Sequence, residues 1–124
     1  MIDRRRLAEL LTAEEARFAA QHPRSQALFG RAGRSLLGGA PMPWMVRWAG
    51  QFPIFVERAF GGRLVDVDGN EYIDFCLGDT GAMTGHAPEA TVAALTAQLR
   101  KGLTYMLPTE DAIWVGEELA RRFG

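Results

Sequence analysis

Apolar side chains recur with helical spacing in the first part of the chain. Residues 4–20 place them on one stripe, which predicts an amphipathic helix. We expect Pro23 to end that helix and Ser25 to cap a second, shorter helix that runs to about Leu37. Gly38-Gly39 then supplies the stop, because glycine readily adopts the backbone conformation that closes a helix.

The next stretch, residues 38–53, is rich in proline and glycine and is predicted to be a loop. It contains aromatic side chains, Trp44 and Trp48 among them, whose exposure to water would be unfavourable. We therefore expect this loop either to lie against a core or to meet a partner.

The pattern then changes to three short runs of β type, which cover residues 54–60, 63–67 and 71–75. Gly61-Gly62 separates the first two runs. Asp68-Gly69-Asn70 is a hairpin signal, because Gly and Asn tolerate positive φ. The three runs predict an antiparallel meander.

Alternation along the second run places Val65 and Val67 on one face of this meander and Leu64 and Asp66 on the other. Such a pattern suits an antiparallel sheet that is covered on one side only. We expect the other side to face solvent.

Two helices are predicted after the sheet. Pro88 stands at a first helical position with Glu89 beside it, and Gly102 closes that helix. Thr109 is expected to cap the final helix, whose first turn is acidic. The resulting parts are a helical segment over residues 1–37, a Pro/Gly/Trp loop over 38–53, and the sheet with its following helices over 54–124.

Composition sets limits on partners and location. Fourteen Lys plus Arg nearly balance fifteen Asp plus Glu, so no broad field favours nucleic acid or an anionic membrane. No run reaches the ~20 apolar residues of a membrane span. The single cysteine, Cys76, sits in an apolar run, where we expect a buried small hydrophobe in a reducing compartment. The expectation is a soluble, cytoplasmic protein without a metal site.

The tripeptide Asp79-Thr80-Gly81 raises the hypothesis of an aspartic protease of the retroviral type. Such a protease dimerises to pair two carboxylates, which share a proton and activate a water. These proteases are nearly all-β, whereas the residues after Pro88 are typical of helices. The protease stays only as an alternative.

A longer succession of motifs is much more specific than that tripeptide. The motifs are Leu37-Gly38-Gly39, Pro53-Ile54-Phe55, Arg58-Ala59, the run from Leu64 to Phe75, Gly85-His86, Gly102-Leu103-Thr104 and Pro108-Thr109-Glu110. In this order they resemble the N-terminal part of class-III, fold-type-I pyridoxal-phosphate enzymes. Within that class, the branch of glutamate-1-semialdehyde aminomutase and the transaminases near it is the most similar. The resemblance covers residues from about 25 to 124.

This resemblance implies an α+β fragment of a fold-type-I transferase, with N-terminal helices, a three-stranded antiparallel meander and then two helices. Residues 54–124 would form the N-terminal part of a small domain, with the large cofactor domain absent. The implied reaction moves an amino group between a small-molecule amino donor and a keto acceptor, with pyridoxal 5'-phosphate as cofactor and a homodimer as the complete enzyme. The implied substrate-side loop residues are Met45, Gly78, Asp79 and Thr80.

Two departures bear on the reaction. The aminomutase pattern has serine, tryptophan and glycine where this chain has Gly78, Asp79 and Thr80. It also has an arginine for a substrate carboxylate where Met45 aligns, with Arg47 two residues away. We therefore expect a transaminase with a different substrate, and an aminomutase, which is an isomerase, as the alternative. Substrate and stereochemistry stay open.

Lys101 is the only lysine in the chain. Pyridoxal-phosphate chemistry requires a lysine for the Schiff base, and Lys101 falls in the solvated last turn of a predicted helix. In the family, the Schiff-base lysine and the phosphate loop lie beyond the point that Gly124 reaches. We therefore expect no catalytic residue and no activity in this chain alone. A non-catalytic interaction module that docks through Trp44, Trp48 and the exposed face of the sheet is a further alternative.

Overall fold

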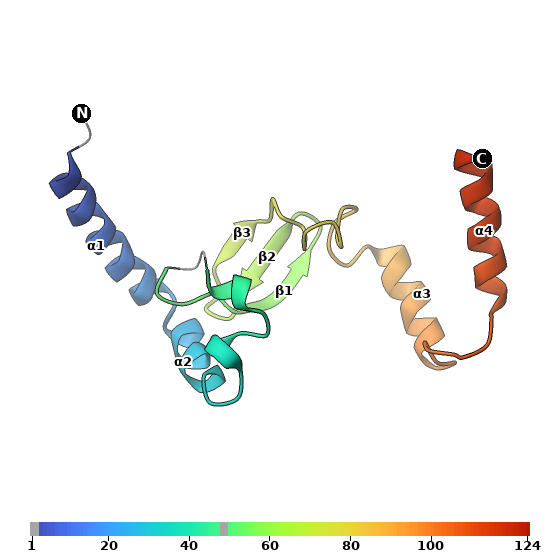
Figure 1. Cartoon of the computed structure of the whole chain (residues 1–124), viewed down its shortest axis with the longest axis horizontal. Coiled ribbons are helices and arrows are strands. Elements are labelled where there is room, and N and C mark those ends of the chain that lie inside the picture. The colour runs from blue at the N-terminus through green and yellow to red at the C-terminus, as the bar shows by residue number, and fades with distance from the viewer. Residues whose placement is uncertain (1–2, 48–49) are drawn as a thin grey trace. The chain divides into compact units, whose positions relative to one another are not determined.

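The computed structural model describes residues 3–47 and 50–124, so the expectation for Trp48 lies outside the described residues (Figure 1). The chain consists of two compact units, residues 1–88 and 89–124. The first holds two helices and a sheet, and the second holds two helices. The expected α+β order of helices, three-stranded antiparallel meander and helices is confirmed.

Helices α1 (Arg4–Gln21) and α2 (Pro23–Ala32) meet at His22. Asp3 caps α1, because its carboxylate accepts hydrogen bonds from the amides of Arg5 and Arg6 at 3.0 and 3.1 Å. The expectation for the second helix was wrong in detail. Pro23 opens α2 at its first position, where a proline needs no N–H, while Ser25 lies inside the helix and is buried.

The second helix also ends earlier than expected, at Ala32 rather than near Leu37. Two short 3₁₀ turns follow, η1 (Leu37–Gly39) and η2 (Pro43–Val46). Gly38 and Gly39 have φ of 72° and 76°, so these glycines turn the chain as the sequence predicts. The loop then leads to Phe52, which is buried and packs on Phe18 of α1 with ring centroids 5.0 Å apart.

The sheet consists of β1 (Val56–Phe60), β2 (Arg63–Asp66) and β3 (Glu71–Ile73), in that spatial order. Both pairs are antiparallel, and a bulge interrupts the first pair between Val56 and Arg58. The third strand stops at Ile73, two residues before the predicted end. The side chain of Asp74 bonds to the following amides and turns the chain out of the ladder.

Neighbouring residues of β2, Val65 and Asp66, are both buried, with 5% and 0% of their surfaces exposed. Because successive side chains of a strand point to opposite faces, both faces are covered at this end of β2. The prediction of a sheet covered on one side only was therefore wrong here. The bend between α1 and α2 supplies the additional cover over Asp66, through His22.

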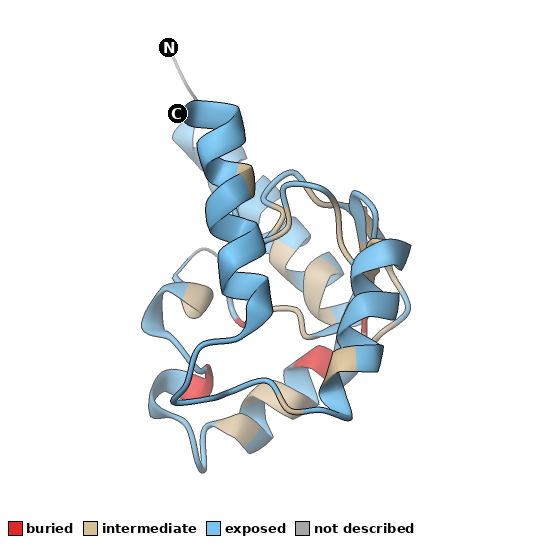
Figure 2. Cartoon of the chain, turned by 90° about the vertical axis from the view of Figure 1, so that its right-hand side faces the viewer, coloured by how far each residue is buried: buried red, intermediate tan, exposed pale blue. Residues whose placement is uncertain are grey.

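The second unit contains α3 (Glu89–Leu99) and α4 (Glu110–Phe123), the two helices that the sequence predicts. Pro88 lies just before α3 and not at its first helical position. Gly102, at φ 98°, ends the turn after α3, and the hydroxyl of Tyr105 donates to backbone carbonyl oxygens there. Thr109 stands at the N-cap of α4 but its side chain makes no capping bond. Neither helix has a buried residue, so their apolar side chains are exposed (Figure 2).

None of the helices within residues 3–47 and 50–124 combines the length and the apolar character that a membrane span needs. Over the same ranges, no three His, Cys, Asp or Glu side chains gather as ligands of a metal ion would.

Candidate functional site

Asp66, at the end of β2, is fully buried in a ring of donors. Its Oδ1 accepts from the amides of Asn70 at 2.8 Å and Asp68 at 3.0 Å. Its Oδ2 accepts from the side-chain amide of Asn70 and the hydroxyl of Tyr72, both at 3.0 Å. Burial alone would raise the pKa of Asp66, but these hydrogen bonds outweigh it and hold the pKa below its usual value. Asp66 is therefore a satisfied structural carboxylate.

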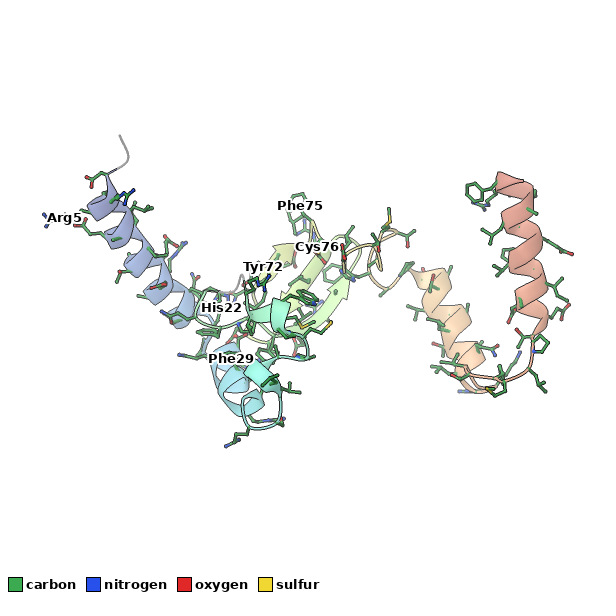
Figure 3. All side chains as sticks on the ribbon, viewed as in Figure 1. Arg5, His22, Phe29, Tyr72, Phe75 and Cys76 are labelled. Carbon is green, nitrogen blue, oxygen red and sulfur yellow. The ribbon has the colours of Figure 1, made fainter. Side chains whose placement is uncertain are left out.

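His22, at the bend between α1 and α2, is the helical partner of this ring. Its Nδ1 lies 2.6 Å from the carbonyl oxygen of Phe18, so Nδ1 carries a proton. Its Nε2 lies 2.6 Å from the hydroxyl of Tyr72. Both side chains are labelled in Figure 3. Burial and then the bond to Asp66 raise the pKa of Tyr72 to about 12, so the hydroxyl keeps its proton.

The hairpin turn contributes a second link between sheet and helices. The carboxylate of Asp68 accepts from the amides of Arg24 at 2.7 Å and Ser25 at 2.9 Å, which are free donors at the start of α2. Burial opposes ionisation, yet these bonds lower the pKa of Asp68 below its usual value. The hydroxyl of Ser25 accepts in turn from the amide of Phe55 at 3.2 Å. The turn thus caps a helix more than forty residues earlier in the chain.

A groove of about 1080 Å³ lies beside these links in the first unit. Met45, half-buried, and Trp44 line it together with the chain leading into β1. Two carboxylates, Glu14 and Glu15, line it from α1, whereas none of its described lining residues is Lys or Arg. Arg47 is exposed and is not among them. The described lining of the groove is therefore mainly apolar and offers no lysine or arginine to a carboxylate.

The loop after β3 begins at Asp74. Its Oδ1 accepts from the amides of Cys76 and Leu77, each at 2.9 Å. Cys76 is exposed, so the expectation of a buried cysteine was wrong. The reason is the early end of β3: Phe75 and Cys76 lie in the turn rather than in the strand, and Phe75 projects away with 93% of its surface exposed (Figure 3).

Four successive residues of this loop have left-handed backbone conformations. The φ angles are 49° at Leu77, 63° at Gly78, 59° at Asp79 and 99° at Thr80. Such angles are unfavourable for residues other than glycine and are concentrated at functional sites. Asp79 and Thr80 are exposed, so their side chains are available to a ligand. Two helices follow the loop, which agrees with setting the all-β protease aside.

The loop ends at His86, whose Nε2 lies 2.7 Å from Oδ2 of Asp74. The hydrogen bond from His86, and then that from the Leu77 amide, hold the pKa of Asp74 below its usual value. His86 also forms an isolated β-bridge with Gly61, with N–H···O bonds of 2.8 and 2.9 Å in the two directions. The two ends of the loop are thus tied to each other and to the turn between β1 and β2.

The predicted site residues fall in two places. Met45 lines the groove, while Gly78, Asp79 and Thr80 lie in the loop after β3 and are not part of the groove lining. Sequence reasoning missed the Asp74–His86 pair. A signal was available, because Asp74 closes the third β run and Gly85-His86 precedes a helix, but their twelve-residue separation hides the contact.

Pyridoxal phosphate needs an amine in a pocket and donors around its phosphate. The only lysine, Lys101, is exposed after α3, in the unit whose helices have no buried residue. The described groove has no lysine or arginine in its lining. The described residues therefore do not by themselves form a site for this cofactor.

Comparison with known proteins extends the picture. The family model described as class-III aminotransferase matches residues 44–124. The glutamate-1-semialdehyde 2,1-aminomutase of Methanocaldococcus jannaschii is 41% identical over 99 residues, which make up 80% of this chain and 23% of that protein. The chain spans about a quarter of the length of the curated relatives it matches.

Two solved structures superpose on the chain. A glutamate-1-semialdehyde aminomutase from Pseudomonas aeruginosa PAO1 is 50% identical, with a TM-score of 0.90 over 99% of this chain and 27% of its own. A transaminase solved with PLP bound is 33% identical, with a TM-score of 0.72 over 81% of this chain and 23% of its own.

Proposed function

The chain belongs to the class-III aminotransferase family, and we propose that it forms the substrate-side portion of a transaminase that uses pyridoxal 5'-phosphate. Such an enzyme moves an amino group from a small-molecule amino donor to a keto acceptor. One observation carries the proposal: the left-handed loop after β3 presents Asp79 and Thr80 to solvent at the positions that the family resemblance assigns to the substrate. The cofactor, when bound, supplies the electron sink for the reaction.

Two observations favour a transaminase over an aminomutase. Met45 lies in a mainly apolar groove, where an aminomutase pattern would have an arginine for a substrate carboxylate. Asp79 adds a negative charge in the second loop, where that pattern has a large ring. Both changes disfavour a second carboxylate on the substrate, because like charges repel and a buried anion needs a partner. The similarity to aminomutases keeps that reaction as the alternative.

In this proposal Asp79 selects the substrate and does not activate water. Asp79→Trp in the complete enzyme should shift the preference among amino donors toward those with an additional carboxylate. Thr80→Ser is the matched control, because it changes the same loop without altering its charge. An unchanged donor profile in Asp79→Trp would mean that Asp79 is only a turn residue.

We also propose that the 124-residue chain is inactive by itself. The support is the exposed position of its only lysine, Lys101, after α3. A complete enzyme would combine this chain's loops with a cofactor lysine from elsewhere, as a cytoplasmic homodimer. Purified chain mixed with an amino donor, a keto acceptor and the cofactor should show no turnover.

A second candidate function is a non-catalytic interaction module. The exposed apolar side chains of α4 favour it, among them Ile113, Trp114 and Phe123 with 64%, 65% and 84% of their surfaces exposed. Size-exclusion chromatography with a full-length relative distinguishes the two. Stable co-elution would support the module, whereas elution apart from the relative would argue against it.

A further inference from the structure

We infer that Asp74 and His86 act together as a latch that holds the loop between them, residues 75–85, in its strained conformation. They are a positioning pair for Asp79 rather than catalytic residues. The role of the loop toward a substrate rests on the proposed function. The latch itself rests on contacts within the first unit.

The first half of the latch fixes where the loop leaves the sheet. Asp74 uses its two oxygens for different tasks: Oδ1 accepts from the amides of Cys76 and Leu77, and Oδ2 lies against His86 at 2.7 Å. The amide of Asp74 donates to the carbonyl oxygen of Gly62 at 2.9 Å. One residue therefore turns the chain, anchors it to the sheet and reaches the far end of the loop.

The second half fixes where the loop returns. His86 exchanges two backbone hydrogen bonds with Gly61, the neighbour of Gly62. Gly85 permits this approach, because a Cβ there would lie 3.2 Å from the Cα of Gly61 and its φ is 93°. Both ends of the loop are thus fastened to the same two-residue turn, and the Asp74–His86 contact joins them directly.

The loop needs such fastening. Leu77, Asp79 and Thr80 all have positive φ, which costs free energy in each case. Within the loop, this conformation includes backbone hydrogen bonds from Ala82 N–H to Leu77 O at 2.9 Å and from Gly85 N–H to Ala82 O at 2.8 Å. Without the latch the chain would relax toward ordinary backbone angles, and Asp79 would lose its fixed position.

Within the described residues, His86 is the only side chain that forms a hydrogen bond or ion pair with the carboxylate of Asp74. The hydrogen bond with His86 is the largest influence on the pKa of Asp74 and lowers it, and Arg63 on the adjacent strand β2 is paired with Glu71. The side chain of Asp74 is only 9% exposed and that of His86 22%, so solvent screens the contact only partly.

Amide hydrogen exchange of the full chain, read by NMR, tests the latch. In Asp74→Asn and in His86→Gln, we expect the amides of Ala82 and Gly85 to exchange about tenfold or more faster, because a hydrogen bond to a charged group is lost. The amide of Val67, which donates to Phe55 O at 2.8 Å, should keep its rate. The control is Arg63→Gln, which breaks an exposed ion pair with Glu71 in the same unit and should leave the exchange of Ala82 and Gly85 unchanged.

The double variant decides whether the two residues act as one device. Asp74→Asn with His86→Gln should exchange no faster than the faster single variant, since either change opens the same contact. Unchanged exchange at Ala82 and Gly85 would overturn the latch, as would equal acceleration at Val67 or additive effects in the double variant. Exchange requires neither cofactor nor substrate, so the latch can fail while the proposed function stands, and the reverse.

Discussion

The hydroxyl of Tyr72 donates a hydrogen bond to Oδ2 of the fully buried Asp66 at 3.0 Å. The same hydroxyl lies 2.6 Å from Nε2 of His22. The two contacts connect β2 and β3 to the bend between α1 and α2. In a unit whose described apolar core is limited to Ala40, Phe52 and Val65, this polar ring holds much of the architecture in place.

Tyr72→Phe should destabilise the first unit by about 1–2 kcal/mol, because the ring keeps its shape while a buried carboxylate loses one donor. The measurement is the free energy of unfolding from urea titration. Tyr105→Phe is the matched control, since its hydroxyl contacts no carboxylate: in an exposed connector it donates to backbone carbonyl oxygens and accepts from the side-chain amide of Gln98. A Tyr72→Phe variant no less stable than Tyr105→Phe would mean that the Asp66 contact contributes nothing.

Asp68→Ala should lower the free energy of unfolding by ~1 kcal/mol, because α2 loses the carboxylate that serves its first amides. Asp68→Asn keeps an acceptor and should recover part of that loss. Circular dichroism should report less helix in Asp68→Ala. An unchanged stability in both variants would contradict the capping role.

Acid should destabilise the first unit through the same carboxylates. The pKa values of Asp66, Asp68 and Asp74 are all lowered by folding. A depressed carboxyl pKa stabilises the fold above the unfolded value, near 3.8, and that contribution is lost as pH falls through the folded pKa. Unfolding free energy measured from pH 6 down to 2 should therefore decrease below about pH 4. A flat profile in this range would contradict the assignment.

Two glycine substitutions should have opposite effects. Gly85→Ala should destabilise by about 1–3 kcal/mol, because φ is 93° and the added Cβ would crowd Gly61. Gly116→Ala should stabilise α4 by about 0.5–1 kcal/mol, because nothing lies within 4 Å of the added Cβ and alanine favours the helix. Thermal unfolding measures both. Effects of the same sign would contradict this assignment of the two positions.

Sequence patterns predict this fold correctly where residues close together in the sequence determine the structure. The meander follows from glycine at Gly61 and from the Asp68-Gly69-Asn70 turn, and both are observed. The patterns fail where a side chain reaches far along the sequence. Asp66 is buried on the face expected to be open because His22, 44 residues earlier, covers it. No periodicity encodes that contact.

The candidate site likewise combines features that the sequence reveals with contacts between distant residues that it does not. Family resemblance identifies the loop of Asp79, and that loop proves to be the strained one. It does not reveal Asp74 and His86, since the contact between them depends on how the β1–β2 turn receives the returning chain. The prediction for Cys76 failed for a related reason: β3 ends where the Asp74 carboxylate accepts hydrogen bonds from the amides of Cys76 and Leu77.

Absorbance spectroscopy of the purified chain mixed with pyridoxal phosphate tests most directly whether this chain supplies substrate-side loops and not the cofactor lysine. We predict no stable Schiff-base band beyond that of free cofactor, no turnover with amino donor and keto acceptor, and the same spectrum for Lys101→Ala. A stable band in the wild-type chain that disappears in Lys101→Ala, together with turnover, would contradict it.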